Sequence, residues 1–160
     1  MDSLMAPGRM EYIKGEKPNG CIFCKESARE KDLVLYEGKS CYIIMNKYPY
    51  TSGHLLVIPF RHVCNMEETN AEERVEMMEL TAMCVRNLKK AFEPEGFNIG
   101  MNLGKVAGAG VDDHLHLHVV PRWLGDTNFA TVLGETRVIP EDIATTRKAL
   151  LQYFRKIEEG

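Results

Sequence analysis

Three of the chain's five histidines fall within the run His114-Leu115-His116-Leu117-His118. Residues two apart share a face of a β-strand, so the run predicts the three histidines on one face and the leucines on the packed face. Neutral imidazole is a nucleophile near pH 7 because its ordinary pKa is about 6.5. The run therefore predicts a chemical face; a solvated polar face and metal chelation are the other interpretations.

A glycine-rich segment, Gly104-Lys-Val-Ala-Gly-Ala-Gly110, lies just before the histidine run. Glycines let backbone N–H groups approach an anion closely, although glycine-rich turns are common and the segment alone decides little. Beside three histidines, it predicts a phosphate cradle in which Gly108 and Gly110 contact substrate. This combination favours catalysis over metal chelation.

Five cysteines suggest two different uses. Cys21 and Cys24 form a Cys-x-x-Cys pair, which by itself fits either a redox-active dithiol or half of a zinc site. The others, Cys41, Cys64 and Cys84, are interpreted as buried or incidental thiols. An odd number of cysteines, and an N-terminus without the apolar segment of a secretory signal, favour reduced thiols and a cytoplasmic location.

Length and composition predict one domain. The chain has 160 residues, of which 44% are hydrophobic, enough for a single core. No uninterrupted apolar stretch reaches the roughly 18 residues that a membrane span needs. A net charge of −3, with 20 basic and 23 acidic residues mixed along the chain, argues against duplex nucleic acid as a partner. We expect an N-terminal arm over residues 1–20 and one catalytic domain over residues 21–160.

Short β-type runs and two helical patterns must position these residues. The expected strands cover residues 33–36, 41–45, 54–58, 97–103 and 114–120, the last stopped by Pro121. A capping box at Thr69–Glu72 or Asn70–Glu73 begins a long helix that ends near Glu93. Its apolar positions at helical spacing are Val75, Met78, Leu80, Met83, Cys84, Leu88 and Phe92. A second helix is expected over residues 141–157, and strands segregated around one main helix give the α+β class.

The motifs together resemble the histidine-triad (HIT) family of nucleotide hydrolases and transferases. The run from His114 to Val120, followed by Pro121-Arg122, is similar to the family signature, and Asn46 to Pro59 resembles its ribose-binding strand and supporting histidine. With the Cys21-Ile-Phe-Cys24 opening, the resemblance covers roughly residues 10 to 140. The segment from His118 to Trp123, followed by Gly125-Asp-Thr-Asn-Phe129, is similar to the diadenosine-polyphosphate phosphorylase-like and hydrolase-like branch.

The resemblance implies a HIT-like antiparallel sheet of about five strands with one long helix and a C-terminal helix. It also implies that His116 attacks the α-phosphorus of a nucleotide and forms a nucleotidyl-histidine, which water or phosphate then cleaves. His118 and His54 match the positions that stabilise the phosphoryl oxygens. Dinucleoside polyphosphates such as diadenosine tetraphosphate are the implied substrates.

Other substrate contacts follow from matching positions in the family. Asn46 matches a ribose contact and Asn102 a phosphate contact, while Ile44 and Leu56 match the apolar walls of the base pocket. Ile44 and Leu56 are equally consistent with plain core residues, and a turn residue is the alternative interpretation of Asn102. One departure is that the family's Gly-Gln-Ser/Thr segment is Ala109-Gly110-Val111 here. The side chain that could assist the leaving group is missing, which disfavours phosphoramidate-type substrates.

Zinc and self-association are further implications of the resemblance. Matching positions in zinc-bearing members predict a site formed by Cys21, Cys24, His62 and His114, and four nitrogen and sulfur ligands would make the zinc structural. A zinc-free thiol pair and an exposed loop His62 are the alternatives. A homodimer is implied, joined through the long helix and a strand edge. Three other functions remain open: a non-catalytic nucleotide-binding module, a phosphoramidate-type nucleotidyl hydrolase and a zinc-dependent hydrolase.

Overall fold

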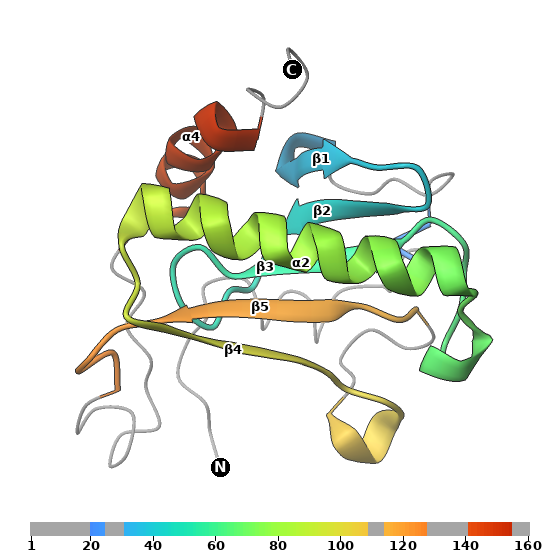
Figure 1. Cartoon of the computed structure of the whole chain (residues 1–160). Helices are drawn as coiled ribbons and strands as arrows, with labels where there is room; N and C mark the ends of the chain where they lie inside the picture. Colours follow the sequence, from blue (N-terminus) through green and yellow to red (C-terminus); the bar gives the residue numbers. More distant parts are fainter. Residues whose placement is uncertain (1–19, 25–30, 109–113, 128–140, 155–160) are drawn as a thin grey trace.

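The computed structural model describes residues 20–24, 31–108, 114–127 and 141–154. Within them lies a five-stranded antiparallel sheet of order β1-β2-β3-β5-β4, crossed on one face by a long helix (Figure 1). The strands are β1 (Val34–Glu37), β2 (Cys41–Met45), β3 (Leu55–Pro59), β4 (Gly96–Met101) and β5 (Leu117–Arg122). The helices are α2 (Ala71–Phe92) and α4 (Ile143–Phe154), with short 3-10 turns η1 (Lys31–Leu33), η2 (Met66–Glu68) and η3 (Lys105–Ala107). This confirms the α+β class and the five-stranded sheet.

Helix α2 begins at the second of the two predicted caps. The side chain of Asn70 accepts a hydrogen bond from the Glu73 backbone N–H at 2.8 Å, and the Glu73 carboxylate accepts one from the Asn70 backbone N–H at 2.9 Å. The helix ends at Phe92, because Glu93 adopts a left-handed conformation with φ 49° and Pro94 follows. Local sequence therefore sets both ends of the longest element.

The packed side of α2 is narrower than its apolar pattern predicts. Leu80, Cys84 and Leu88 are buried against the sheet, whereas Val75 and Met78 are 64% and 60% exposed. The helical pattern had grouped all five together. Val75 and Met78 therefore belong to a second, uncovered apolar side of the helix.

Register divides the sheet residues between two faces. On the face covered by α2, the Cys41 thiol donates to the backbone oxygen of Glu73, and Leu117 and Val119 of β5 lie on the same face. His118 lies on the opposite face, directly across from Leu56 of β3. Alternation along β5 thus separates the packed residues from the catalytic candidate, as the sequence predicts for this part of the run.

The boundaries of the histidine strand differ from the prediction. The strand begins at Leu117, so the predicted strand positions of His114 and His116 are wrong: both precede β5. Pro121 does not stop the strand but pairs with Phe97 of β4. β3 pairs with β5 only as far as Val119, and the Pro121 carbonyl accepts from Thr51 Oγ1 at 2.9 Å on that side. The proline's missing N–H therefore leaves no strand partner unsatisfied.

Other differences are confined to element ends. Strand β4 starts one residue before the predicted range and stops before Asn102, while α4 starts at Ile143 instead of residue 141. The residues that follow Phe154 in the predicted helix lie outside the described part. So does the predicted arm over residues 1–20, except Gly20, and the domain limits remain a prediction. Neither helix of the described chain combines the length and hydropathy needed to cross a membrane.

Candidate active site

Three histidine rings gather on the face of the sheet opposite α2. His54 immediately precedes β3, His116 immediately precedes β5, and His118 is the second residue of β5. The ring centroid of His118 lies 5.1 Å from that of His54 and 4.9 Å from that of His116. The predicted catalytic set is therefore one contiguous cluster.

Hydrogen bonds fix the tautomer of each ring in turn. The Tyr50 backbone N–H donates to His54 Nδ1 at 3.1 Å, and the Asn46 side-chain amide lies 3.3 Å from the same nitrogen. Because His54 Nδ1 accepts, the proton of the neutral ring sits on Nε2. That nitrogen lies 2.9 Å from His118 Nδ1 and donates to it. The proton of His118 must then be on Nε2.

His118 presents this N–H group without a partner. Its Nε2 atom is buried and has no hydrogen-bond partner among the described residues, and the residue lines a pocket. Burial, and secondarily the nearby His116 ring, lower the pKa of His118 to about 4. The ring is therefore neutral at pH 7. A neutral, preoriented N–H donor beside a pocket suits an anionic oxygen.

His116 is held as the opposite tautomer. Its Nδ1 donates to the backbone oxygen of His114 at 2.8 Å, so the lone pair of the neutral ring is on Nε2. Burial lowers the pKa of His116, which keeps that lone pair available at pH 7. The residue is 7% exposed and packs against Phe23, with 5.3 Å between ring centroids. His116 does not line the pocket itself. It packs against His118, which does.

The pocket has a volume of about 300 Å³ and lies over β4 and β5. Its lining comes from these strands, the residue after β4, the turn before β3 and the segment after β5: Tyr50, Thr51, Asn98, Ile99, Gly100, Met101, Asn102, His118, Val120, Arg122, Asp126 and Thr127. Of the predicted site residues, His118 and Asn102 line this pocket.

The Asn102 side-chain amide donates to the Gly108 backbone oxygen at 3.4 Å, which joins the pocket to the glycine-rich segment. Gly108 has φ +88°, a conformation that favours glycine, and Gly110 lies outside the described residues.

Three predicted substrate contacts lie elsewhere. Ile44 and Leu56 are cross-strand partners, 5% and 4% exposed, within the hydrophobic core beside His118. Asn46 accepts a hydrogen bond from the Tyr48 backbone N–H at 3.0 Å, in addition to its contact with His54. The structure thus gives Asn46 a role in holding His54, and the substrate roles of all three stay predictions.

Sequence reasoning missed most of the pocket lining, including Thr51, Asn98, Arg122, Asp126 and Thr127. Strand alternation carries part of the missing signal. Asn98, Gly100 and Asn102 are non-apolar positions two apart, and Val120 and Arg122 continue the alternation from His118. Only the pairing of β4 with β5, which joins distant parts of the chain, brings the two series together.

A second cluster gathers the four predicted metal ligands, whose ligand atoms all lie within 4.8 Å of one another. Cys21 Sγ is 3.2 Å from His114 Nδ1, and Cys24 Sγ is 3.3 Å from His62 Nδ1 and 3.7 Å from His114 Nδ1. Donors around a tetrahedral zinc, with bonds of about 2.0–2.3 Å, are separated by roughly 3.5 Å, so the spacing fits. His114 Nε2 donates to the Pro59 backbone oxygen at 2.8 Å, which points Nδ1 at the thiols. The cluster can hold a metal.

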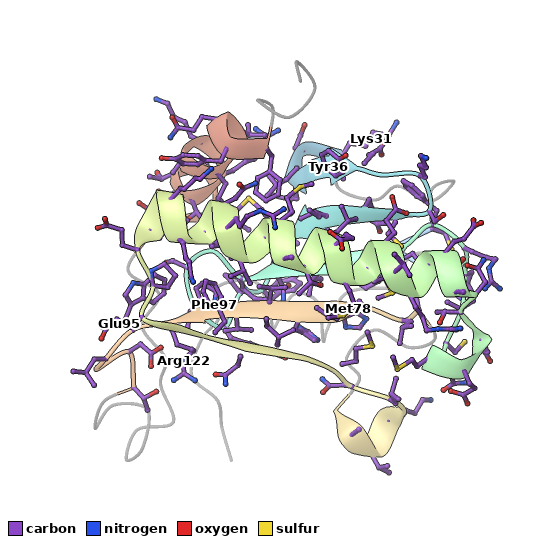
Figure 2. All side chains as sticks on the ribbon, viewed as in Figure 1. Lys31, Tyr36, Met78, Glu95, Phe97 and Arg122 are labelled. Carbon is purple, nitrogen blue, oxygen red and sulfur yellow. The ribbon has the colours of Figure 1, made fainter. Side chains whose placement is uncertain are left out.

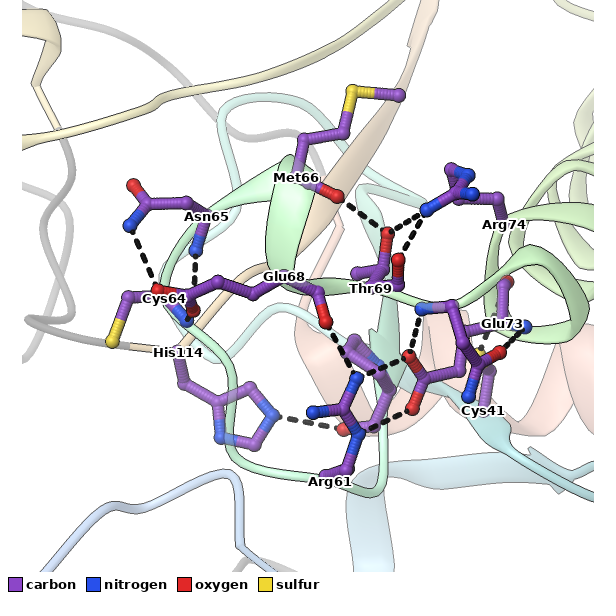
Figure 3. A network of polar contacts seen from close by, with 12 residues as sticks. Cys41, Arg61, Cys64, Asn65, Met66, Glu68, Thr69, Glu73, Arg74 and His114 are labelled. Atoms are coloured by element: carbon purple, nitrogen blue, oxygen red, sulfur yellow. Dashed lines mark hydrogen bonds and ion pairs between the residues drawn. The ribbon is translucent and has the colours of Figure 1, made fainter.

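An ion pair anchors the loop that carries His62 (Figure 3). The guanidinium of Arg61 binds both carboxylate oxygens of Glu73, at 3.0 and 2.8 Å, and also the backbone oxygen of Glu68 at 2.7 Å. Glu73 is 3% exposed and belongs to the capping box of α2. Hydrogen bonding to Arg61 lowers the pKa of the Glu73 carboxyl. The start of α2 and the metal cluster are therefore tied to one another through adjacent residues.

Comparison with known proteins agrees with this geometry. The chain is 46% identical over 121 residues to the AP-4-A phosphorylase of Mycobacterium tuberculosis, a match covering 76% of this chain but 62% of that protein. It is 35% identical over 105 residues to adenylylsulfatase HINT3 of Arabidopsis thaliana, covering 65% of this chain and 53% of that protein. A zinc-bound histidine triad family protein from Mycobacterium smegmatis superposes with a TM-score of 0.71 at 30% identity, covering 88% of this chain and 96% of that one. The HIT domain model matches residues 27–123, and the chain belongs to the HIT domain family.

Proposed function

We propose that this protein cleaves the α-phosphate linkage of dinucleoside polyphosphates, such as diadenosine tetraphosphate, through a covalent nucleotidyl-histidine at His116. The observation that carries the proposal is the chain of tautomers in which His54 donates to His118 and the Nε2–H of His118 has no partner in the described part of the chain. That N–H is positioned to bind a phosphoryl oxygen. The adjacent His116 has its lone pair on Nε2, the atom that would attack.

The reaction proceeds as two displacements. The His116 Nε2 lone pair forms a bond to the α-phosphorus, and the bond to the bridging oxygen breaks, so the nucleoside polyphosphate leaves with that electron pair. Water or inorganic phosphate then attacks the same phosphorus and the N–P bond breaks, which returns the lone pair to Nε2. His118 donates to the phosphoryl oxygens in both steps, because negative charge there is what the site must stabilise.

The named relatives support the substrate class. The mycobacterial match is an AP-4-A phosphorylase, and this chain spans about three fifths of its length, 62%. A relative that uses phosphate as the acceptor favours phosphorolysis over hydrolysis for this chain too. Phosphate dependence of ADP formation from diadenosine tetraphosphate separates the two acceptors.

Trapping the intermediate tests the proposal. Wild-type protein incubated with diadenosine tetraphosphate labelled at the α-phosphorus, then quenched in mild base, should carry labelled AMP on His116. His116→Asn should carry none and lose at least about 10³-fold in kcat/KM. Asparagine retains an N–H that can donate to the His114 backbone oxygen, so a thermal unfolding midpoint close to wild type controls for folding. Wild-type turnover by this variant would contradict the proposal.

Zinc is the metal we propose for the second cluster. The thiol and imidazole donor set, the spacing of the donors and the Pro59 contact to His114 all support Zn²⁺. Four protein ligands leave no coordination position for water. Zinc would therefore stabilise the fold at this site and would not act as a Lewis acid on the substrate. The five cysteines are all thiols, which suits the reducing cytoplasm that we propose as the location.

A homodimer is part of the proposal. Val75 and Met78 on α2 are 64% and 60% exposed, and Ile99 on the outermost strand β4 is 47% exposed. Met78 projects from α2 on the side where β4 lies (Figure 2). Apolar side chains on a helix, beside a strand edge that no other described strand pairs with, are typical of a buried contact between copies. Light scattering should give twice the chain mass, reduced to one chain in Met78→Lys but not in Leu124→Lys, which changes a 91% exposed residue elsewhere. A monomeric wild type would contradict the dimer.

A further inference from the structure

The open pocket does not coincide with the predicted base pocket. Ile44 and Leu56 lie on the β2–β3 side of His118 and are buried, whereas the pocket extends from His118 over β4 and the far end of β5. A dinucleoside polyphosphate has two nucleoside halves on either side of the reacting phosphorus. The half that becomes attached to His116 does not account for this space.

We propose that the pocket is a subsite for the leaving group, and that its far end, formed by Asn98, Arg122, Asp126 and Thr127, binds the second nucleoside. This inference rests on the proposed function and extends it to the part of the substrate that departs. With such a subsite, the protein would select substrates by the length of the leaving polyphosphate and by the group at its end.

The dimensions of the pocket fit such a ligand. His118 and Arg122 are both lining residues on the same face of β5, four residues apart, which corresponds to about 13 Å along a strand. A single phosphate group cannot span that distance, whereas a chain of several phosphoryl groups can. In the sheet register Arg122 lies across from Gly96, the first residue of β4. A nucleoside carried at the end of a polyphosphate chain would therefore reach this end of the pocket.

Gly100 keeps the middle of the pocket open. It pairs with His118 in the sheet register, and a Cβ atom placed on it would meet nothing within 4 Å. Asn98 on β4 and Asn102 just after β4 lie two residues to either side of it, and both line the pocket. The floor between His118 and the far end is therefore low and carries amide side chains on either side, which suits a linker that passes over it.

Charge distinguishes a nucleoside from a bare phosphate at the far end. Among the described residues that line the pocket, formal charges belong to Arg122 and Asp126, and these two neutralise one another. Arg122 binds both carboxylate oxygens of Asp126, at 2.5 and 2.7 Å, and its remaining terminal nitrogen donates to Asn98 Oδ1 at 2.6 Å. Hydrogen bonding to Arg122 also lowers the pKa of the Asp126 carboxyl, so the carboxylate is charged at pH 7. A neutral end with amide, carboxylate and hydroxyl groups suits ribose hydroxyls and offers no excess positive charge to a terminal phosphate.

Filling the pocket tests the proposal with two substrates that share the AMP half. Diadenosine tetraphosphate has a long leaving group that ends in a nucleoside, whereas adenosine 5′-phosphorofluoridate releases only fluoride. Gly100→Val should lower kcat/KM at least about tenfold for the first substrate and less than about twofold for the second. Glu37→Val, which adds a valine to β1 at the opposite edge of the sheet and outside the lining, should leave both values near wild type.

The pattern of losses decides the outcome. Equal losses for both substrates in Gly100→Val would mean that the pocket holds the shared AMP half, and no loss for either would mean that it holds no part of the substrate; each result overturns the proposal. Failure of the proposed function looks different, because wild-type protein would then form a labelled adduct with neither substrate.

A charge change at the far end gives a second, independent test. Asp126→Asn keeps a side-chain oxygen for the Trp123 backbone N–H but leaves the Arg122 charge uncompensated. The ratio of kcat/KM for diadenosine tetraphosphate to that for ATP, whose leaving pyrophosphate ends in a bare phosphate, should fall about tenfold. An unchanged ratio would overturn the assignment of the far end to a nucleoside.

Discussion

Two histidines four residues apart, His114 and His118, have contrasting surroundings. Both ring nitrogens of His114 have partners. Nδ1 contacts the thiols of Cys21 and Cys24, and Nε2 donates a hydrogen bond to the Pro59 backbone oxygen. His118 has one nitrogen engaged by His54 and the other buried without a partner among the described residues. The difference teaches that the surroundings of an imidazole, not its place in the motif, decide which of its ring nitrogens are engaged and which remains available for a further contact.

His116 lies between these two regions and depends on both. Its Nδ1 is held by the backbone oxygen of His114, which belongs to the metal cluster, and its ring packs against that of His118. The proposed nucleophile is therefore oriented by a proposed metal ligand and adjoins the proposed donor to the phosphoryl oxygens. Variants that separate stability from rate can show whether the two regions act independently.

Removing His54 should give the largest effect on the catalytic side of the comparison. His54→Ala deletes the donor that fixes the tautomer of His118, and kcat should fall about 10²- to 10³-fold. His54→Gln should recover a substantial part of that loss, because a glutamine amide can donate to His118 Nδ1. Steady-state kinetics of the two variants with diadenosine tetraphosphate provide the measurement.

Thermal unfolding of both His54 variants serves as the control. Midpoints within a few degrees of wild type would show that the rate loss arises in the site and not from unfolding. If His54→Gln were as slow as His54→Ala while both stayed folded, the hydrogen-bond relay would not be the reason for the loss.

Disrupting the metal cluster should give an intermediate effect, on stability instead of rate. His62→Ala should lower the bound zinc below one ion per chain and lower the unfolding midpoint by about 5–10 °C, because metal binding contributes folding free energy. The kcat measured well below that midpoint should stay within about threefold of wild type. Metal analysis, calorimetry and kinetics on the same preparations are needed.

Cys64→Ser is the matched control for the metal cluster. Cys64 is close to His62 in sequence but is not one of the clustered ligands, so this variant should retain zinc and the wild-type midpoint. Activity that fell in proportion to zinc content at an unchanged midpoint would instead favour a zinc-dependent hydrolase.

Much of the fold could be predicted because its signals are local. The capping box at Asn70, the stop before Pro94 and the apolar run of Cys41–Met45 are each contained within a few residues, and each specifies an element. That β5 continues through Pro121 could not be predicted from such local signals. It depends on where β3 stops pairing, which is a property of a distant segment.

The candidate site also has a part that local sequence indicates and a part that depends on distant segments. The histidine run was conspicuous in the sequence because three histidines at alternate positions are rare, and the resemblance to the HIT family supplied His54 and the four side chains that the structure gathers in the second cluster. Asn98, Arg122 and Asp126 are common surface residues, and only the register between β4 and β5 assembles them into a pocket. Sequence therefore indicated which side chains cluster better than it indicated the shape of the pocket beside them.

The smallest expected effect is on how the free energy of unfolding depends on pH. It separates His118, whose pKa burial lowers, from an exposed histidine. The folded pKa of His118 is about 4 because of burial and the nearby His116, whereas an unfolded histidine titrates near pH 6.5. Between these pH values the unfolded chain binds a proton at this residue that the folded chain does not, so the free energy of unfolding falls as pH falls from 6.5 to 4.

Comparing wild type with His118→Gln isolates this contribution from the other histidines. The wild type should lose more unfolding free energy than the variant across that window, by on the order of 1–2 kcal/mol once partial solvent access is allowed for. Urea unfolding of zinc-loaded protein at several pH values supplies the measurement. Parallel pH profiles would mean that His118 titrates alike in the folded and unfolded chain, and a ring already protonated near pH 6.5 could not be the neutral donor that the relay from His54 requires.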